Sequence, residues 1–221
     1  MNADEDSRGH GHGHSHHHGA SREGARQPNA FNPARAVLLD DPRRFDYLSV
    51  EQVLTILDAP PGGMVVDFGT GTGTYAIEIA KRRSDLHIVA LDEQPGMLEL
   101  LHAKPETQRL DNLEPILTDE IDRFAGVADR ILALNVLHEL GDDALRQIKS
   151  LLKPSGAVLF IDWDSSIERP VGPPKDHTYN GAEARTRLEG LGFRVESVMS
   201  MKYHFVLRAQ IAKSSVPTPT E

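Results

Sequence analysis

Residues 64–74, MVVDFGTGTGT, constrain the fold more than any other part of the chain. The apolar start of this stretch predicts a buried parallel strand, with Asp67 at its carboxyl end. Three alternate glycines, Gly69, Gly71 and Gly73, then predict a tight turn that leads into a helix. A glycine turn between a strand and a helix lets a ligand approach backbone N–H groups near the helix N-terminus. A tight turn that binds nothing is the alternative interpretation.

The spacing of these glycines bears on the kind of ligand. The dinucleotide-binding fingerprint is G-x-G-x-x-G, whereas this chain has G-x-G-x-G, with Thr74 where the last glycine would stand. Asp67 lies two residues before the first glycine, where its carboxylate would repel a pyrophosphate and attract an ammonium group. The loop therefore favours a cationic or zwitterionic ligand and disfavours an NAD-dependent oxidoreductase.

A second acid follows at the spacing expected of a ribose-binding carboxylate. The apolar strand predicted at 86–91 ends in Asp92, about 19 residues after Gly73 and close to the roughly 20 residues typical of such an acid. A carboxylate at this place can accept hydrogen bonds from both ribose hydroxyls. A helix N-cap is the alternative role for Asp92.

Together, these residues resemble the first motif, and the acid that follows it, of class I S-adenosylmethionine-dependent methyltransferases. The resemblance runs from about Phe31 to Ile211 and is closest to the ubiquinone/menaquinone-biosynthesis-like (type 11) small-molecule methyltransferases. It implies an α/β fold with a Rossmann-like, mostly parallel seven-stranded sheet of order 3-2-1-4-5-7-6, strand 7 antiparallel, flanked by helices. It also implies S-adenosyl-L-methionine as cofactor and a small molecule as methyl acceptor. A non-catalytic ligand-binding or metal-handling protein on the same fold is the alternative.

The resemblance further implies which residues hold the cofactor. In the family, an acid after the third strand contacts the adenine amino group; Asp119 and Glu120 are both candidates here, and a solvent-exposed loop acid is the alternative. Asn135 follows the fourth strand, at the sheet edge where ligands bind in open α/β folds. The predicted cofactor-binding residues are Asp67, Gly69, Thr70, Gly71, Gly73, Asp92, Glu93, Asp119 and Asn135.

The acceptor pocket is predicted at the ends of the fourth, fifth and seventh strands and in the proline-rich loop at 168–177. Methyltransferases that act on amino groups of DNA bases usually carry Asn/Asp-Pro-Pro-aromatic where this chain has Asn135-Val-Leu-His138, which favours a small-molecule acceptor. Imidazoles titrate near neutrality, so histidines are the natural proton acceptors, with a structural hydrogen bond as the alternative for each. The predicted catalytic residues are His138, His177 and His204, and the predicted pocket walls are Asp162, Trp163, Tyr179 and Tyr203.

A methyltransferase domain is predicted at 31–212, between two polar tails at 1–30 and 213–221 that are expected to be disordered. Residues 31–60 are expected to form an N-terminal helical cap in two pieces, separated by Asp40-Asp41-Pro42. In the family, this piece covers the cofactor cleft.

The N-terminal tail is rich in histidine, and imidazole suits zinc, copper and nickel, so the tail could bind a divalent metal. A catalytic metal is disfavoured there, because a flexible segment cannot fix an open coordination geometry. The predicted metal-binding residues are His10, His12, His14, His16, His17 and His18.

Composition excludes several other classes of function. The formal net charge is −9 and only 5% of residues are aromatic, without a basic stripe, which argues against nucleic acid as a partner. Apolar runs are too short for a membrane span, and the N-terminus is too polar for a signal peptide. The chain has no cysteine, which excludes disulfides and thiolate metal sites. A cytoplasmic enzyme fits this composition.

Overall fold

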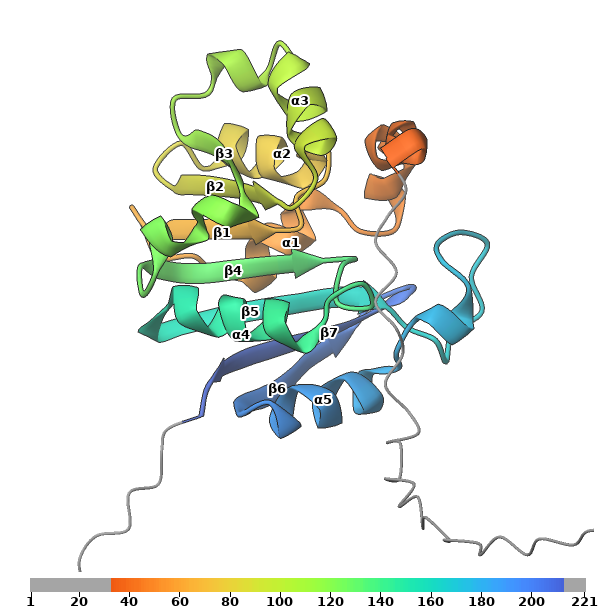
Figure 1. The fold of residues 1–221 in the computed structure, drawn as a ribbon. Helices are drawn as coiled ribbons and strands as arrows, with labels where there is room; N and C mark the ends of the chain where they lie inside the picture. The colour runs from red at the N-terminus through yellow and green to blue at the C-terminus, as the bar shows by residue number, and fades with distance from the viewer. Residues whose placement is uncertain (1–32, 213–221) are drawn as a thin grey trace, which may run out of the picture.

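In the computed structural model, which describes residues 33–212, seven strands form one sheet of order β3-β2-β1-β4-β5-β7-β6 (Figure 1). The pairs from β3 through β5 are parallel, and β7 runs antiparallel to both of its neighbours, β5 and β6. The strand order and the antiparallel seventh strand expected from the sequence are confirmed. The strands are β1 Met64–Phe68, β2 His87–Asp92, β3 Leu113–Leu117, β4 Ala128–Leu134, β5 Leu152–Trp163, β6 Phe193–Ser200 and β7 His204–Ile211.

Strand β5 begins at Leu152, ahead of Pro154 and Gly156, two residue types that usually interrupt regular structure. Ala128 already pairs with Leu152, and the register then shifts before the regular pairing resumes. The irregularity absorbs the proline, which cannot donate a ladder hydrogen bond.

Helices cover both faces of the sheet. Two of them begin with a capping box, in which the residue before the helix and the third residue of the helix exchange hydrogen bonds. The Ser49 hydroxyl accepts a hydrogen bond from the Gln52 N–H at 3.2 Å, and the Gln52 side-chain oxygen accepts one from the Ser49 N–H at 3.1 Å. Asn180 and Glu183 cap the last helix in the same way. The α-helices are α1 Val50–Leu57, α2 Thr74–Arg82, α3 Pro95–Ala103, α4 Asp142–Leu151 and α5 Gly181–Gly190.

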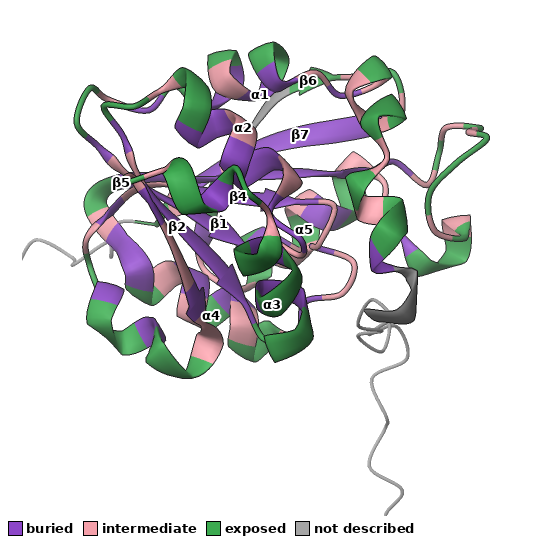
Figure 2. Cartoon of the chain, turned by 90° about the horizontal axis from the view of Figure 1, so that it is seen from above, coloured by how far each residue is buried: buried purple, intermediate pink, exposed green. Residues whose placement is uncertain are grey.

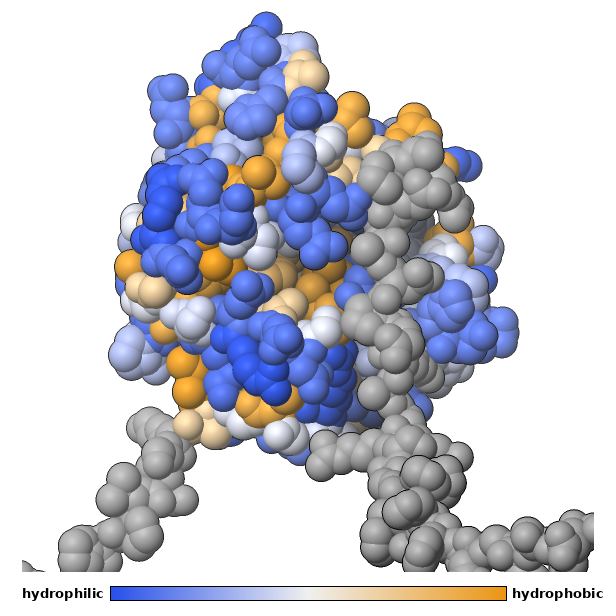
Figure 3. All heavy atoms as spheres, in the orientation of Figure 1, coloured by the Kyte–Doolittle hydropathy of each residue, from blue (hydrophilic) through white to orange (hydrophobic). Residues whose placement is uncertain are grey.

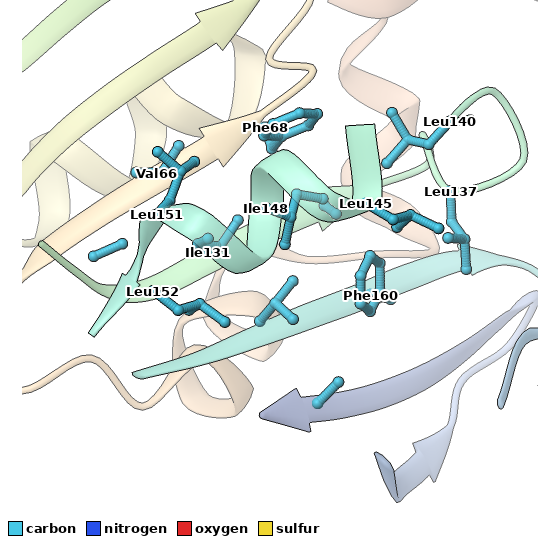
Figure 4. Packing of buried hydrophobic residues seen from close by; sticks show 14 of the residues in the cluster. Val66, Phe68, Ile131, Leu137, Leu140, Leu145, Ile148, Leu151, Leu152 and Phe160 are labelled. Carbon is cyan, nitrogen blue, oxygen red and sulfur yellow. The ribbon is translucent and has the colours of Figure 1, made fainter. Parts of the chain in front are cut away.

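The sheet separates two hydrophobic clusters. Figure 2 shows that its strands are largely buried, in purple. Val66 and Phe68 pack with Ile148 of α4 in the first cluster (Figure 4), whereas Val65 belongs to the second cluster with Ile79 of α2. This alternation follows from the strand period of two. Burial on both faces explains why β1 reads as a continuous apolar run.

The segment before α1 forms two short 3-10 helices, η1 Pro33–Asp40 and η2 Pro42–Asp46, with the break at Asp41. It lies at the sheet edge where the parallel strands end, and residues 164–180 form a loop at that same edge (Figure 1). Both segments are therefore placed to cover whatever binds there. Within residues 33–212, no helix has the length and apolar character needed to cross a bilayer.

Candidate active site

A cavity of about 300 Å³ lies at the carboxyl ends of β1, β2 and β4. Figure 3 shows apolar side chains gathered in the middle of this face of the molecule, with hydrophilic residues around them. The predicted cofactor residues that line the cavity are Asp67, Gly69, Thr70, Gly71, Asp92, Glu93 and Asn135. The structure thus brings seven of the nine together.

The loop after β1 requires glycine at two positions, because the backbone has a positive φ there and because a side chain would clash with its neighbours. Gly69 and Gly73 have φ of +76° and +75°. A Cβ on Gly69 would lie 2.7 Å from Val136, and a Cβ on Gly73 would overlap Leu101. Gly73 is not among the residues that line the cavity; it lets α2 approach α3. A direct contact between Gly73 and a ligand stays a prediction.

Three N–H groups of this loop are already used inside the protein. Gly69 and Thr70 both donate to the Leu91 carbonyl at 2.9 Å, and Gly71 donates to Asp92 Oδ2 at 2.8 Å. The expectation that the turn offers its backbone donors to a ligand is wrong for these residues, because they tie the loop to the end of β2. Without those donors, the loop is poorly suited to a pyrophosphate.

Two buried carboxylates face the cavity. Burial raises the pKa of Asp67 to about 6, the nearby Asp92 adds to the rise, and a 2.7 Å hydrogen bond from Thr70 opposes it. Asp67 is therefore largely ionised at neutral pH and attracts a cation. Burial also raises the pKa of Asp92, against hydrogen bonds from the Gln94 and Gly71 N–H groups. Gln94, not Asp92, is the N-cap of α3.

Sequence reasoning missed Arg44, the one lysine or arginine among the residues that line the cavity. Its Nη1 donates to the Leu39 carbonyl at 2.7 Å, and its guanidinium lies 5.4 Å from the centre of the Tyr75 ring. It faces a cavity that also contains four acidic side chains, Asp67, Asp92, Glu93 and Glu139. No motif marks Arg44, because it reaches the cavity from η2, far along the chain from the glycine loop.

The N-terminal segment is fastened to the glycine loop by one carboxylate. Asp40 Oδ1 accepts from Thr72 Oγ1 at 2.6 Å, Thr74 Oγ1 at 2.8 Å and Lys104 Nζ at 2.6 Å. We call these four residues the Asp40 clasp. The clasp places Leu39 against Gly71 in the cavity wall. It also accounts for Thr74, a hydroxyl where the dinucleotide fingerprint has a glycine.

His138 and Asp162 form a buried pair at the ends of β4 and β5. Asp162 accepts from the His138 N–H at 3.0 Å and lies 3.0 Å from His138 Nδ1, and it also accepts from the Trp163 N–H at 2.7 Å. Burial alone would lower the pKa of His138, but the carboxylates of Asp162 and Glu139 raise it to about 10. An imidazolium cannot accept a proton, so this pairing argues against His138 as the base.

Beside this pair, four rings pack together: Tyr47, Trp163, Tyr203 and His204, which we call the aromatic group. The ring centres of Trp163 and His204 are 4.2 Å apart, and Tyr47 lies 5.7 Å from Trp163 and 6.0 Å from Tyr203. His204 is fully buried, and burial lowers its pKa to about 4. His204 is therefore neutral at pH 7, and Tyr47 is a member that sequence reasoning missed.

The other predicted residues lie apart from these groups. His177 is exposed at the end of a short turn, η5 Lys175–His177, and Asp119 is exposed in η4 Thr118–Phe124, where Thr118 lines the cavity instead. The Tyr179 hydroxyl accepts from Arg187 at 3.2 Å, and its ring packs against the first core cluster. Their roles stay predictions.

The histidine-rich tail lies outside the described residues, so its metal binding stays a prediction. Within residues 33–212, no three His, Cys, Asp or Glu side chains are arranged to hold a metal ion.

Comparison with known proteins agrees with this geometry. A family model described as a methyltransferase domain matches residues 66–158. The fold is similar to that of a SAM-dependent methyltransferase from Aquifex aeolicus, with 31% identity, a TM-score of 0.76, and coverage of 83% of this chain and 100% of that one.

Two curated relatives match a shorter stretch. The release factor glutamine methyltransferase of Escherichia coli (strain K12) is 30% identical over 122 residues, 55% of this chain and 44% of the relative. The ubiquinone biosynthesis O-methyltransferase of Vibrio campbellii is 28% identical over 130 residues, 58% of this chain and 53% of the relative. The chain thus spans about half the length of these relatives.

A Rossmann-like sheet with an acid, a glycine loop and a second acid on the next strand defines an α/β protein that binds a nucleoside cofactor. The chain belongs to the class I S-adenosylmethionine-dependent methyltransferases, as the sequence predicted, and S-adenosylmethionine is its cofactor.

Proposed function

We propose that the protein transfers the methyl group of S-adenosylmethionine to a small-molecule acceptor at the carboxyl ends of β4 and β5. The observation that carries this proposal is the charge arrangement in the cavity: the buried Asp67 carboxylate and the Arg44 guanidinium line the same space. These two charges complement the ammonium and the carboxylate of the cofactor's amino-acid part.

The remaining lining residues fit the rest of the cofactor. Asp92 would accept from the ribose hydroxyls, and Leu91 and Met97 offer an apolar surface to the adenine. Asn135 adopts a left-handed conformation with φ of +57°, a strain of about 1–3 kcal/mol for a residue that is not glycine. Its buried Oδ1 has no partner among the described residues, so it can accept from a donor on the cofactor.

When bound, S-adenosylmethionine supplies an activated methyl group, so the main task of the protein is to align the acceptor with it. The Asp40 clasp holds Leu39 and the rest of the N-terminal segment against the glycine loop, in the wall of the cavity. Catalysis would come mostly from this positioning.

The sequence Asn135-Val-Leu-His138, which differs from the motif of DNA amino methyltransferases, supports a small acceptor. The test is incubation of the protein with cell extract and S-adenosylmethionine labelled in the methyl group, followed by separation of low-mass and protein fractions. We expect label in a low-mass product. Label in protein alone would contradict the small-molecule acceptor and match the kind of acceptor named for the Escherichia coli relative. No transfer despite cofactor binding would indicate a non-catalytic binding protein.

Asp40→Asn is expected to speed the dissociation of S-adenosylhomocysteine about tenfold, because hydrogen bonds to a charged group contribute about 1.5–3 kcal/mol and part of this is kept by asparagine. Asp41→Asn is the matched control, since it removes the same charge from the next residue, whose side chain bonds to Arg43 and takes no part in the clasp. Dissociation rates can be measured by surface plasmon resonance. Equal rates for the two variants would show that the clasp does not retain the cofactor.

A further inference from the structure

One acidic side chain of the cavity wall has no part in the contacts proposed for the cofactor. Asp67 would attract its ammonium group, Arg44 its carboxylate, and Asp92 would accept from its ribose hydroxyls. Two acids of the lining remain, and they differ in exposure: Glu93 is exposed, whereas the side chain of Glu139 is only 18% exposed. Moving a charge out of water costs free energy, so a carboxylate kept at this place calls for a positive partner.

Glu139 is held at the cavity by its own turn and by a neighbouring imidazolium. Its N–H donates to the Val136 carbonyl at 2.8 Å. His138 lies between two carboxylates, with Nδ1 3.0 Å from Asp162 and Nε2 3.5 Å from Glu139 Oε1. The single positive charge of His138 is thus shared by two negative ones. The three side chains together keep an excess of negative charge, and of the three only Glu139 lines the cavity.

The turn after β4, residues 135–141, forms the wall of the cavity on the β4 side. Strand β1 lies between β2 and β4 in the sheet, and its glycine loop lies against this wall, where a Cβ on Gly69 would be 2.7 Å from Val136. Burial is the main cause of the raised pKa of Asp92, and nearby acids, Glu139 among them, add to it. Glu139 is therefore close enough to the end of β2 for its charge to act there.

This wall is the side of the cavity that the sulfur of the cofactor would face. The sulfur is bonded to both the ribose unit and the amino-acid chain, so the residues that would hold those two parts lie on either side of it. These residues come from β1, β2 and the N-terminal segment, which leaves the turn after β4 for the sulfur itself. The polar side chains that the turn contributes are Glu139 and Asn135, whose buried Oδ1 has no partner among the described residues. Both offer oxygen atoms, which attract a positive charge.

We propose that Glu139, held by His138 and Asp162, recognises the positive charge of the sulfonium, so that the cavity selects S-adenosylmethionine over S-adenosylhomocysteine. The two molecules differ by one methyl group and one charge on sulfur. The inference rests on the cofactor contacts of the proposed function and is independent of the acceptor. Because the Glu139 side chain is largely shielded from solvent, its attraction for a cation is screened less than that of an exposed acid.

Such a contact acts on binding and release more than on the chemical step. Attraction to the sulfonium stabilises the bound cofactor before the reaction, and an interaction made in the ground state does not raise the rate of the step itself. Transfer of the methyl group leaves a neutral thioether, which the charge of Glu139 no longer attracts. The spent cofactor is then exchanged more readily for a fresh one.

Binding of charged and neutral ligands to the full chain tests this assignment. S-adenosylmethionine and sinefungin, in which a carbon bearing an ammonium group replaces the sulfonium, are positively charged at this position, and S-adenosylhomocysteine is neutral. Isothermal titration calorimetry would give the three dissociation constants. We expect Glu139→Gln to weaken both charged ligands about tenfold, the order of one partly shielded charge pair, and to change S-adenosylhomocysteine by less than about twofold.

Further variants separate the charge of Glu139 from its shape. Glu139→Asp keeps the carboxylate on a shorter side chain, so it should retain most of the preference for the charged ligands. Glu189→Gln removes the same charge from α5, where Glu189 pairs with Arg185 outside the cavity, and should match the unaltered protein. Glu139→Ala gives the same comparison if the glutamine variant does not fold.

An equal loss of affinity for all three ligands in Glu139→Gln would overturn the assignment, because Glu139 would then support the wall of the cavity and not recognise a charge. Unchanged affinities would overturn it as well. In both cases the cofactor still binds to the unaltered protein, so the proposed methyl transfer stands. If the unaltered protein binds none of the three ligands, the proposed function itself fails, and this inference with it.

Discussion

Asp162→Ala is expected to lower the free energy of unfolding by about 3–5 kcal/mol, the range for removing one partner of a buried ion pair. Asp162 is 1% exposed, and three donors converge on it: the N–H and Nδ1 of His138 and the N–H of Trp163. Alanine would leave all three unpaired beside the site. Urea denaturation measures the loss, with Asp143→Ala as the control, because that carboxylate is almost fully exposed.

The same variant should reveal the charge of His138 through its pH dependence. The folded-state pKa of His138, about 10, lies above its ordinary value of 6.5, so the pair contributes fully below pH 6.5. This contribution is lost as the pH rises through 10. The difference in stability between the unaltered protein and Asp162→Ala should therefore shrink between pH 7 and pH 10. A difference that stays constant would show that His138 is neutral in the fold.

The local part of the site was predictable from the sequence because its signals are local. The strand, the glycine turn and Asp67 follow one another directly, and Asp92 lies at a spacing set by one strand–helix–strand unit. Any chain with this pattern must bring the two acids to the same edge of a parallel sheet.

A cap over the site was expected from the family, but which of its residues face the site was not predictable in the same way. Arg44 and Tyr47 belong to a segment of short 3-10 helices without a hydrophobic period, and its position depends on Asp40 meeting Thr72 and Lys104, which are remote in sequence. Such contacts are properties of the folded chain. The sequence contains these residues, but no local pattern in it shows that they come into contact in the fold.

The three candidate histidines show a further limit. They look equivalent in the sequence. Strand pairing, however, places His204 opposite Trp163, and the turn after β4 brings His138 within hydrogen-bond distance of Asp162. One imidazole is thereby charged and one is neutral, while His177 stays exposed. A pKa depends on neighbours in space, so residue type alone could not rank them.

Arg44→Ala is expected to weaken binding of S-adenosylhomocysteine about 10- to 100-fold, because a hydrogen-bonded pair with a carboxylate contributes about 1.5–3 kcal/mol. Calorimetry with 5′-methylthioadenosine, which keeps the nucleoside but has no amino-acid part, separates this contact from a structural role. Its affinity should stay unchanged in Arg44→Ala.

The neighbouring Arg43→Ala provides the matched control for this charge, since Arg43 is exposed and pairs with Asp41 outside the cavity. It should leave both affinities unchanged. If Arg44→Ala instead weakens both ligands equally, Arg44 acts by holding Leu39 through its 2.7 Å hydrogen bond and the segment as a whole. If neither ligand is affected, the guanidinium does not face the cofactor's carboxylate, and the charge arrangement that supports the proposed function rests on Asp67 alone.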